Sequence, residues 1–362
     1  MIKYLGSKRS LLRYLTGILE LFPELHSVAD LFSGTSRCGH AFKTMGRRVI
    51  SSDHNTYAYT LAQCYVAADR ELFEEDALKI ITELNALTGR PGYFTETFCE
   101  RSRFFQPFNG ERVDAIRERI EELNLDPILR AIVLTSLMEA ADRVDSTCGI
   151  QMAYVKEWAK RSYRPLTLRL PELLPSVEWG SCEAHLMSAA EATQFSTDIA
   201  YLDPPYNQHS YLSNYHIWES LVLWDKPEVY GVACKRVDCR ERKSDYNSKR
   251  KCLKALTHLV QRLSAPLFVV SFNNEGFIDR DTMIELLSTR GEVKVFELPF
   301  KRYIGAQIGI HNPDGKRVGE VSHTVNTEYI FVVCTSELLA RIPDAQRRLS
   351  DFERNVIIPE RS

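Results

Sequence analysis

Apolar residues recur along this chain at two spacings, which predict helices and strands in alternation. Between Ser10 and Phe22 the apolar residues follow helical spacing until Pro23 ends the pattern, which predicts an amphipathic helix. Elsewhere, short apolar runs bounded by polar or turn-forming residues are typical of buried strands. The expected strands are Ser27–Phe32, Arg48–Ser52, Ser176–Trp179, Asp198–Leu202, Leu267–Phe272, Val293–Leu298 and Glu328–Cys334. Helices are expected between them, notably at Tyr215–Leu223, Ser248–Leu263 and Arg280–Leu287.

This alternation is typical of an α/β fold with a doubly wound, mostly parallel sheet, whose ligands bind at the carboxyl ends of the strands. The last two strands are joined by a turn-rich stretch containing Asn312–Gly315 and no helix, so the last strand should be antiparallel. Between Asp69 and Pro175 the pattern changes to helices with irregular joints, which indicates an inserted lobe. The predicted organisation is an α/β domain formed by residues 1–68 and 176–335, an inserted helical lobe of residues 69–175, and a C-terminal tail of residues 336–362.

Composition narrows the class of protein. The 362 residues are 44% apolar and 26% charged, as in ordinary globular proteins. The formal net charge of -2 means that any surface for nucleic acid must be local. No apolar run reaches the roughly 18 residues of a membrane span, so we expect a cytoplasmic protein without membrane contact. The nine cysteines are scattered without a CxxC pair, which suggests neither disulfides nor a metal site.

The segment Asp203–Tyr206, with the sequence Asp-Pro-Pro-Tyr, directly follows the apolar strand that ends at Leu202. Two prolines cannot continue a central strand, and they hold an extended backbone whose carbonyl groups are free to accept hydrogen bonds. The N6 amino group of adenine is a poor nucleophile because its lone pair is delocalised into the ring. The Asp203 carboxylate and the Pro204 carbonyl could accept both N6 hydrogens and direct that lone pair toward a methyl donor, while Tyr206 offers a π face to the base. Alone, these four residues could equally be a turn that ends a strand.

The turn after the first strand, Ser33–Ser36, is a second candidate site. It contains Gly34 and precedes a predicted helix, so backbone N–H groups and the helix N-terminus would face a bound carboxylate. Asp53 ends the second strand, where a carboxylate can accept the hydroxyl groups of a ribose, and we expect it also to cap the following helix. A nicotinamide-dependent enzyme is disfavoured because the GxGxxG pattern is missing.

Four motifs in this order resemble those of the D12-class, Dam-like adenine-N6 DNA methyltransferases, a group that includes many modification enzymes of restriction systems. The motifs are Tyr4-Leu5-Gly6-Ser7-Lys8, Asp30-Leu31-Phe32-Ser33-Gly34-Thr35, Asp53, and Asp203-Pro204-Pro205-Tyr206. Further similar stretches are Asn214-Tyr215-His216 with Glu219, Ser271–Gly276, Lys301–Tyr303 and Asn326–Tyr329. The resemblance implies a Rossmann-like class I methyltransferase fold with a target-recognition lobe, S-adenosyl-L-methionine as cofactor, and methylation of N6 of a flipped adenine in double-stranded DNA. It also implies a restriction-modification, phage or mobile-element setting, with a cognate restriction endonuclease encoded separately.

The same resemblance assigns the site residues. The catalytic residues that it implies are Asp203, Pro204, Pro205 and Tyr206. The cofactor-binding residues that it implies are Tyr4, Gly6, Ser7, Lys8, Asp30, Phe32, Ser33, Gly34, Thr35, Asp53 and Asp203. Taken singly, Tyr4 and Lys8 could be a packed aromatic and a solvated cation. Two positions depart from the family: Ser36 stands where a second glycine is expected, and Gly180–Cys182 follows the expected third strand where relatives carry an acid.

Residues 226–262 hold eleven Lys and Arg against four Asp and Glu, a basic stretch that could contact DNA phosphates without reading sequence. The expected DNA contacts are Lys235, Arg236, Arg240, Arg242, Lys243, Lys249, Arg250 and Lys251. In the lobe, arginines mix with aromatics such as Phe104 and Phe105, but aromatics at this density more often form a core than read bases. RNA adenine or cytosine N4 would pose the same chemical problem as DNA adenine. A nucleic-acid-binding protein with an inactive methylase core is a further alternative, supported only by the altered loop at Ser36.

Overall fold

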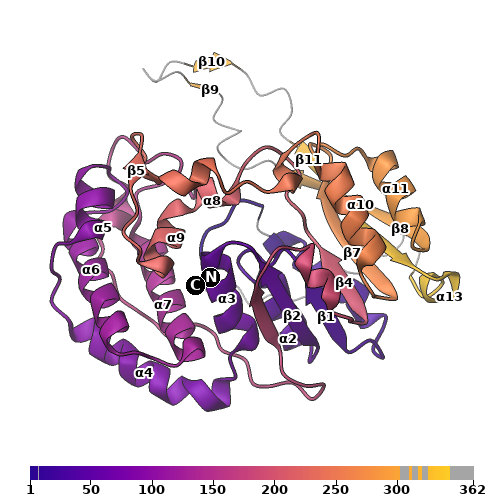
Figure 1. The fold of residues 1–362 in the computed structure, drawn as a ribbon, viewed down its shortest axis with the longest axis horizontal. Coiled ribbons are helices and arrows are strands. Elements are labelled where there is room, and N and C mark those ends of the chain that lie inside the picture. Colours follow the sequence, from indigo (N-terminus) through magenta and orange to yellow (C-terminus); the bar gives the residue numbers. More distant parts are fainter. Residues whose placement is uncertain (7, 302–309, 312–316, 320–324, 343–362) are drawn as a thin grey trace.

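The structure, a computed structural model, describes residues 1–6, 8–301, 310–311, 317–319 and 325–342. Seven strands form one sheet in the order β3-β2-β1-β4-β7-β11-β8, with helices packed on both faces (Figure 1). The inner strands β1 (Ser27–Asp30), β2 (Arg48–Asp53), β4 (Ile199–Leu202) and β7 (Leu267–Asn273) run parallel to one another. The predicted Rossmann-like, doubly wound fold is confirmed.

The last strand of the sheet, β11 (Val325–Cys334), lies between β7 and β8 (Glu292–Lys301) and is antiparallel to both. The predicted antiparallel last strand is therefore confirmed. The turn expected at Asn312–Gly315 lies outside the described residues. Within the same connection, β9 (Ile310–His311) and β10 (Arg317–Gly319) pair antiparallel with each other.

The prediction of a third strand at Ser176–Trp179 is wrong. The strand is β3 (Glu183–Leu186), which pairs with β2 at the edge of the sheet. Its side chains are half-buried or exposed, so it lacks the apolar run by which the inner strands are predicted. Trp179 lies outside the sheet, with its ring stacked on His26. Gly180–Cys182, the position compared with the family's acid, therefore precedes the third strand.

Two apolar layers cover the sheet. On one face, α1 (Leu12–Glu20) and α2 (Arg37–Thr44) pack against strand residues that include Val269. On the other face, α10 (Cys252–Arg262) and α11 (Arg280–Ser288) pack against residues that include Val270. Neighbouring residues of a strand belong to opposite layers because side chains alternate across a sheet. Since both faces are covered, the inner strands β4 and β7 are almost entirely apolar, which made them predictable.

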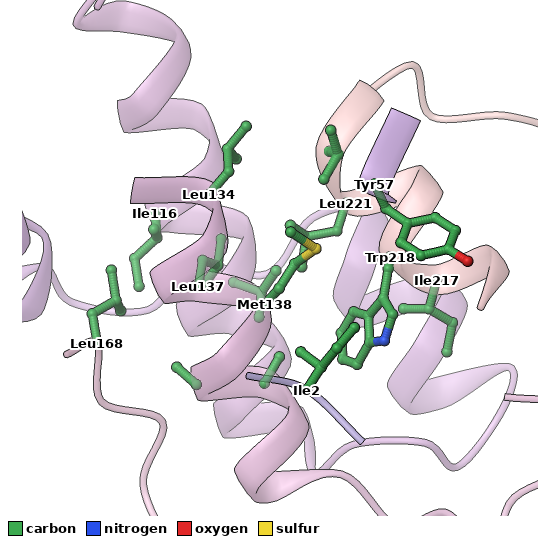
Figure 2. Close-up of a cluster of buried hydrophobic side chains, with 14 of the residues drawn as sticks. Ile2, Tyr57, Ile116, Leu134, Leu137, Met138, Leu168, Ile217, Trp218 and Leu221 are labelled. Atoms are coloured by element: carbon green, nitrogen blue, oxygen red, sulfur yellow. The ribbon is translucent and has the colours of Figure 1, made fainter. Parts of the chain in front are cut away.

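A third core joins the helices of residues 69–175 to the rest of the chain (Figure 2). These helices are α4 (Arg70–Ala86), α5 (Tyr93–Thr95), α6 (Pro107–Glu122) and α7 (Pro127–Val144). Met138 of α7 packs in one cluster with Trp218 of α9 (His216–Leu223) and with Tyr57 of α3 (Thr56–Ala62), as Figure 2 shows. The helices of this segment thus share a core with two helices outside it, and the division of the chain into domains stays a prediction.

The remaining elements are short. Between β4 and α10 the chain forms α8 (Tyr211–Asn214), α9 and an antiparallel hairpin of β5 (Val229–Tyr230) and β6 (Lys235–Arg236). After β11 comes α13 (Ser336–Leu339). In the described part of the chain no helix is long and apolar enough to cross a membrane, and no three His, Cys, Asp or Glu side chains lie together as metal ligands would.

Candidate active site

The carboxyl ends of β1, β2 and β4 border one cavity of about 780 Å³, the place where ligands bind in this class of fold. Every described residue that was expected to bind the cofactor lines it: Tyr4, Gly6, Lys8, Asp30, Phe32, Ser33, Gly34, Thr35, Asp53 and Asp203. Ser7 lies outside the described residues. Of the four expected catalytic residues, Asp203 and Pro205 line the cavity, Pro204 is buried and Tyr206 is half-buried.

The turn after β1 has one glycine instead of two and still folds back tightly. Gly34 has φ 51°, and a β-carbon there would lie 3.2 Å from the ring of Tyr4, so any other residue would be strained on both grounds. Ser36, in the place of the missing glycine, also adopts the left-handed conformation with φ 58°. Its N–H donates to the carbonyl of Ser33 at 2.6 Å. The serine thus keeps the turn with some backbone strain, and the inactive-core alternative loses its support.

Asp53 fixes this turn from the end of β2. Its Oδ2 accepts the N–H of Gly34 at 3.1 Å. The prediction that Asp53 also caps the following helix is wrong: its Oδ1 accepts the N–H of Asn55 at 2.9 Å, but Asn55 precedes α3, and no N–H group of the helix itself donates to Asp53 among the described residues. The first N–H groups of α3, those of Thr56 and Tyr57, donate instead to Glu219 on α9, at 3.2 and 2.9 Å. A fully buried acid far along the chain therefore caps this helix and leaves Asp53 to the cavity.

Asp30, at the end of β1, is a buried carboxyl group whose two oxygens have no hydrogen bond of normal geometry with any described residue. Burial, and then the negative charge of Asp203, raise the pKa of Asp30 to about 8, and the nearby N–H of Gly39 opposes this rise only in part. Arg37, the first residue of α2, lines the same cavity, and its buried Nε also lacks a hydrogen bond within the described chain. A carboxyl and a guanidinium group in this condition fit a ligand that carries both charges.

Asp203 forms an ion pair inside the cavity. Its Oδ1 lies 3.0 Å from Nζ of Lys8, whose side chain is almost fully buried. Burial raises the pKa of Asp203, and the Lys8 cation opposes that rise. Burial alone would lower the pKa of Lys8, but the carboxylates of Asp203 and Glu328 more than offset this and raise it. Lys8 therefore stays charged, and the ion pair occupies one oxygen of Asp203 and leaves the other for a ligand.

Tyr206 is held beside Asp203 by contacts with the end of β7. Its carbonyl accepts the N–H of Phe277 at 2.9 Å. Its ring meets Phe272 edge-on, with 6.3 Å between the ring centroids. Burial raises the pKa of the Tyr206 hydroxyl, so the ring is neutral at physiological pH. The extended segment after β4 is thus fixed at the cavity wall.

A stack of tyrosines forms another wall of the cavity. The ring of Tyr4 is stacked on Tyr211 of α8 at 5.2 Å and on Tyr215 at 4.5 Å, and its hydroxyl lies 3.0 Å from that of Tyr57. Gly6 has φ 72°, and a β-carbon there would lie 3.1 Å from the hydroxyl of Tyr211. Tyr4 is therefore both a packed aromatic and part of the cavity wall. Tyr211 has no local signal in the sequence.

Two further segments that the sequence did not indicate line the cavity. Ser188–Ala190 follows β3, and Tyr246 comes from the segment before α10. The ring of Tyr246 meets Phe32 edge-on at 4.9 Å. Where the resemblance implies an acid after the third strand, this chain thus has small residues.

The basic stretch does not form one continuous surface for DNA. Arg236 is 3% exposed, and its guanidinium group bonds the carboxylates of Asp225 and Asp238. The prediction that Arg236 contacts DNA is wrong, because its donors are already bound inside the protein. Arg242 donates to the buried Glu219 at 2.9 Å, which ties this segment to the cap of α3. Charge along the sequence did not distinguish these internal arginines from surface ones.

The other cations of the stretch are accessible. Of the expected DNA contacts, Lys235 is half-buried and Arg240, Lys243, Lys249, Arg250 and Lys251 are exposed; Lys226, Lys254 and Arg262 of the same stretch are exposed too. Lys243, Lys251 and Lys254 also line the cavity. In the lobe, Phe104 and Phe105 are completely buried, so the expectation that such aromatics form its core is confirmed for them.

Comparison with known proteins decides the family. The family model of the D12 class N6 adenine-specific DNA methyltransferases matches residues 4–285. The chain belongs to this family. Its similarity to the Type II methyltransferase M.NlaIII of Neisseria lactamica is 30% identity over 319 residues, which cover 83% of this chain and 92% of that protein.

Other Type II methyltransferases are similar at lower identity. The Type II methyltransferase M.CviAII of Paramecium bursaria Chlorella virus 1 is 28% identical, over 76% of this chain and 83% of that protein. The Type II methyltransferase M.FokI of Planomicrobium okeanokoites is 26% identical over 83% of this chain, which spans only 50% of that protein's length. The chain is thus a D12-class methyltransferase that acts on adenine in DNA at specific sites, with S-adenosylmethionine as the methyl donor.

Proposed function

We propose that Asp203 and the carbonyl of Pro204 activate N6 of the target adenine, and that the turn after β1 holds S-adenosylmethionine beside it. The observation that carries this proposal is that the Asp203 carboxylate lines the same cavity as Asp30 and Asp53, at the ends of three neighbouring strands. Parallel strands present their carboxyl ends at one edge, so a donor and an acceptor bound there would be close together.

The residues of the cavity fit the cofactor part by part. A volume of about 780 Å³ lies within the range of small-molecule sites. We assign the ammonium group of the cofactor to Asp30 and its carboxylate to Arg37, because both carboxyl oxygens of Asp30 and Nε of Arg37 lack a hydrogen bond among the described residues. Asp53 would accept the ribose hydroxyls, and the adenine of the cofactor would lie toward Phe32 and Tyr246.

Bound S-adenosylmethionine supplies an electrophilic methyl group on a positively charged sulfur. Asp203 and the Pro204 carbonyl accept the two N6 hydrogens, which favours a tetrahedral nitrogen whose lone pair is available for attack. Lys8 keeps Asp203 ionised and fixes one of its oxygens. After transfer, the proton released from N6 can pass to the Asp203 carboxylate. Tyr206 is held where its ring can stack on the base, which must leave the duplex to reach the cavity.

The exposed cations of residues 235–251 are assigned to phosphate contacts beside the site. Lys243 and Lys251 lie at the cavity itself, so a duplex held by this segment would place its flipped base near Asp203. The helices of residues 69–175 are assigned to target recognition. Because the relatives include Type II methyltransferases, we assign the chain to a restriction-modification setting in the cytoplasm, with a separately encoded endonuclease as its partner.

Long-read sequencing tests this function without knowledge of the target sequence. DNA from cells that express the wild-type chain should carry N6-methyladenine at one recurring sequence, and DNA from cells that express Asp203→Ala should not. Absence of the mark in the wild type rejects the proposal. Marks that persist in Asp203→Ala at equal protein level reject the role of Asp203.

A further inference from the structure

Lys8 lies between two carboxylates rather than one. Its Nζ is 3.0 Å from Oδ1 of Asp203 and 3.7 Å from Oε2 of Glu328. The side chains of the three residues are 8%, 22% and 10% exposed, respectively, so all of them are largely removed from water. Within the described part of the chain, this cluster contains one cation and two anions. It therefore carries a net negative charge beside the site where the adenine amine is expected.

Glu328 is placed in this cluster by the antiparallel last strand. β11 enters the sheet next to β7, and Glu328 pairs in register with Asn273 at the carboxyl end of β7. The side-chain N–H of Asn273 donates to Oε1 of Glu328 at 2.7 Å. The other oxygen, Oε2, has no hydrogen bond among the described residues and is the one nearest Lys8. A buried carboxylate that is only partly hydrogen-bonded costs stability, so its presence points to a role in the cluster.

The charge of the cluster matters because methyl transfer brings positive charge toward it. The N6 lone pair forms a bond to the methyl carbon, and the carbon–sulfur bond breaks with its electron pair on sulfur. Positive charge thereby passes from sulfur to N6, and one N6 proton then leaves to the Asp203 carboxylate. If Lys8 were paired with Asp203 alone, the two charges would cancel, and Asp203 would be a weak acceptor for a nitrogen that is becoming cationic.

We propose that Glu328 is a positioning residue that shares the Lys8 cation with Asp203 and so preserves a net negative charge at the acceptor of the adenine amine. This inference rests on the proposed role of Asp203. Glu328 does not touch the base; it acts through Lys8.

The electrostatic surroundings of Asp203 agree with this role. Burial raises the pKa of Asp203, Lys8 lowers it, and Glu328 raises it further. Removal of the Glu328 charge should therefore make Asp203 more acidic and less able to accept a proton. The titratable groups that face Asp203 from the surrounding described elements are Lys8, Cys38, Asp30, Tyr201, Tyr206, Tyr211 and Glu328.

Two substitutions separate the charge of Glu328 from its shape. Glu328→Gln keeps the shape and an acceptor for Asn273 but removes the charge, whereas Glu328→Asp keeps the charge and shortens the side chain. Single-turnover methylation of unmethylated plasmid DNA at saturating S-adenosylmethionine should slow on the order of 10- to 100-fold in Glu328→Gln. Glu328→Asp should be faster than Glu328→Gln. The acid limb of the pH–rate profile of Glu328→Gln should move to lower pH. The control is Glu297→Gln, in an exposed ion pair on β8, which should behave as wild type.

Calorimetric binding of S-adenosylmethionine and thermal unfolding should show that Glu328→Gln is folded and binds the cofactor as wild type does.

The outcomes are distinct. A Glu328→Gln rate within about threefold of wild type overturns the inference, and so does a Glu328→Asp variant that is slower than Glu328→Gln. If wild type methylates and Asp203→Ala does not, any of these results rejects the role of Glu328 alone. If wild type leaves DNA unmarked, the proposed function fails instead.

Discussion

Replacement of Asp30 by asparagine is expected to stabilise the cofactor-free protein, by an amount that grows as the pH rises. Asp30 is 1% exposed, and burial and Asp203 raise its pKa from 3.8 to about 8. Between these two values the folded protein holds a proton on Asp30 that the unfolded chain has lost. The stability of the wild type therefore falls as the pH rises through this interval, and the loss is complete above the folded pKa.

The size of the stability difference follows from the number of pH units below the folded pKa of Asp30 over which it grows. Asparagine is neutral at every pH, so the difference in unfolding free energy between Asp30→Asn and wild type isolates the titration of Asp30. From pH 5 to the folded pKa of about 8 there are about three units, each worth about 1.36 kcal/mol. The difference should grow by about 4 kcal/mol between pH 5 and pH 9.

Urea unfolding followed by tryptophan fluorescence at several pH values measures this difference. Asp281→Asn, at a side chain that is 85% exposed, is a matched control that should show no such growth. The affinity of wild type for the cofactor should also rise between pH 6 and pH 7, because Asp30 must lose its proton to pair with the ammonium group of the cofactor. This rise should be absent in Asp30→Asn. A stability difference that is the same at pH 5 and pH 9 would refute the reasoning.

Three further outcomes are expected. Glu219→Gln should lower the free energy of unfolding by about 2–3 kcal/mol, because a fully buried carboxylate that caps α3 and pairs with Arg242 loses its charge. Urea unfolding measures this change, and Glu75→Gln, at an exposed side chain, is the control. Lys249→Glu combined with Arg250→Glu, at two exposed positions, should weaken binding to a labelled DNA duplex and reduce the salt dependence of that binding. The affinity for S-adenosylmethionine, measured by calorimetry, should stay as in wild type. Unchanged DNA affinity would exclude these two cations from the interface. Tyr206→Phe should keep kcat/KM for methylation within about threefold of wild type, whereas Tyr206→Ala should lower kcat/KM roughly 10- to 100-fold because base stacking is lost. Equal values for the two variants would show that the Tyr206 ring does not contribute to catalysis.

The sequence predicted those parts of the fold that leave a local pattern. The inner strands β4 and β7 are covered on both faces, so their residues are almost all apolar. β3 lies at the sheet edge with half-buried side chains and leaves no such run, which is why the strand was expected several residues too early. Trp179 contributed to that error, since an aromatic that stacks on His26 outside the sheet is indistinguishable in sequence from one inside it.

The site was predictable where its residues follow strand ends, and hidden where they meet only in space. Asp30, Asp53 and Asp203 each end a strand, and the parallel sheet brings them to one cavity. Glu219 caps α3, a helix more than 160 residues earlier in the chain. Glu328 lies close to Lys8 in space although the two residues are far apart in the sequence. Such contacts depend on strand order and register, which short patterns do not encode.

Counting charged residues along the sequence predicts a basic stretch but not the contacts of each cation. A count of cations over residues 226–262 indicates a basic stretch, but it does not show which charges are already paired. Arg236 lies between Asp225 and Asp238, and Arg242 is bound to Glu219, so these two serve the fold. The exposed Lys249 and Arg250 remain candidates for phosphate contacts.

In the proposed mechanism the Asp203 carboxylate prepares the adenine amine for methylation. The single-turnover rate of purified Asp203→Ala on the DNA that wild type methylates, with S-adenosylmethionine binding measured in parallel, tests this role. We expect a rate at least about a thousandfold below wild type together with measurable cofactor binding. A variant that methylates this DNA at the wild-type rate would contradict it.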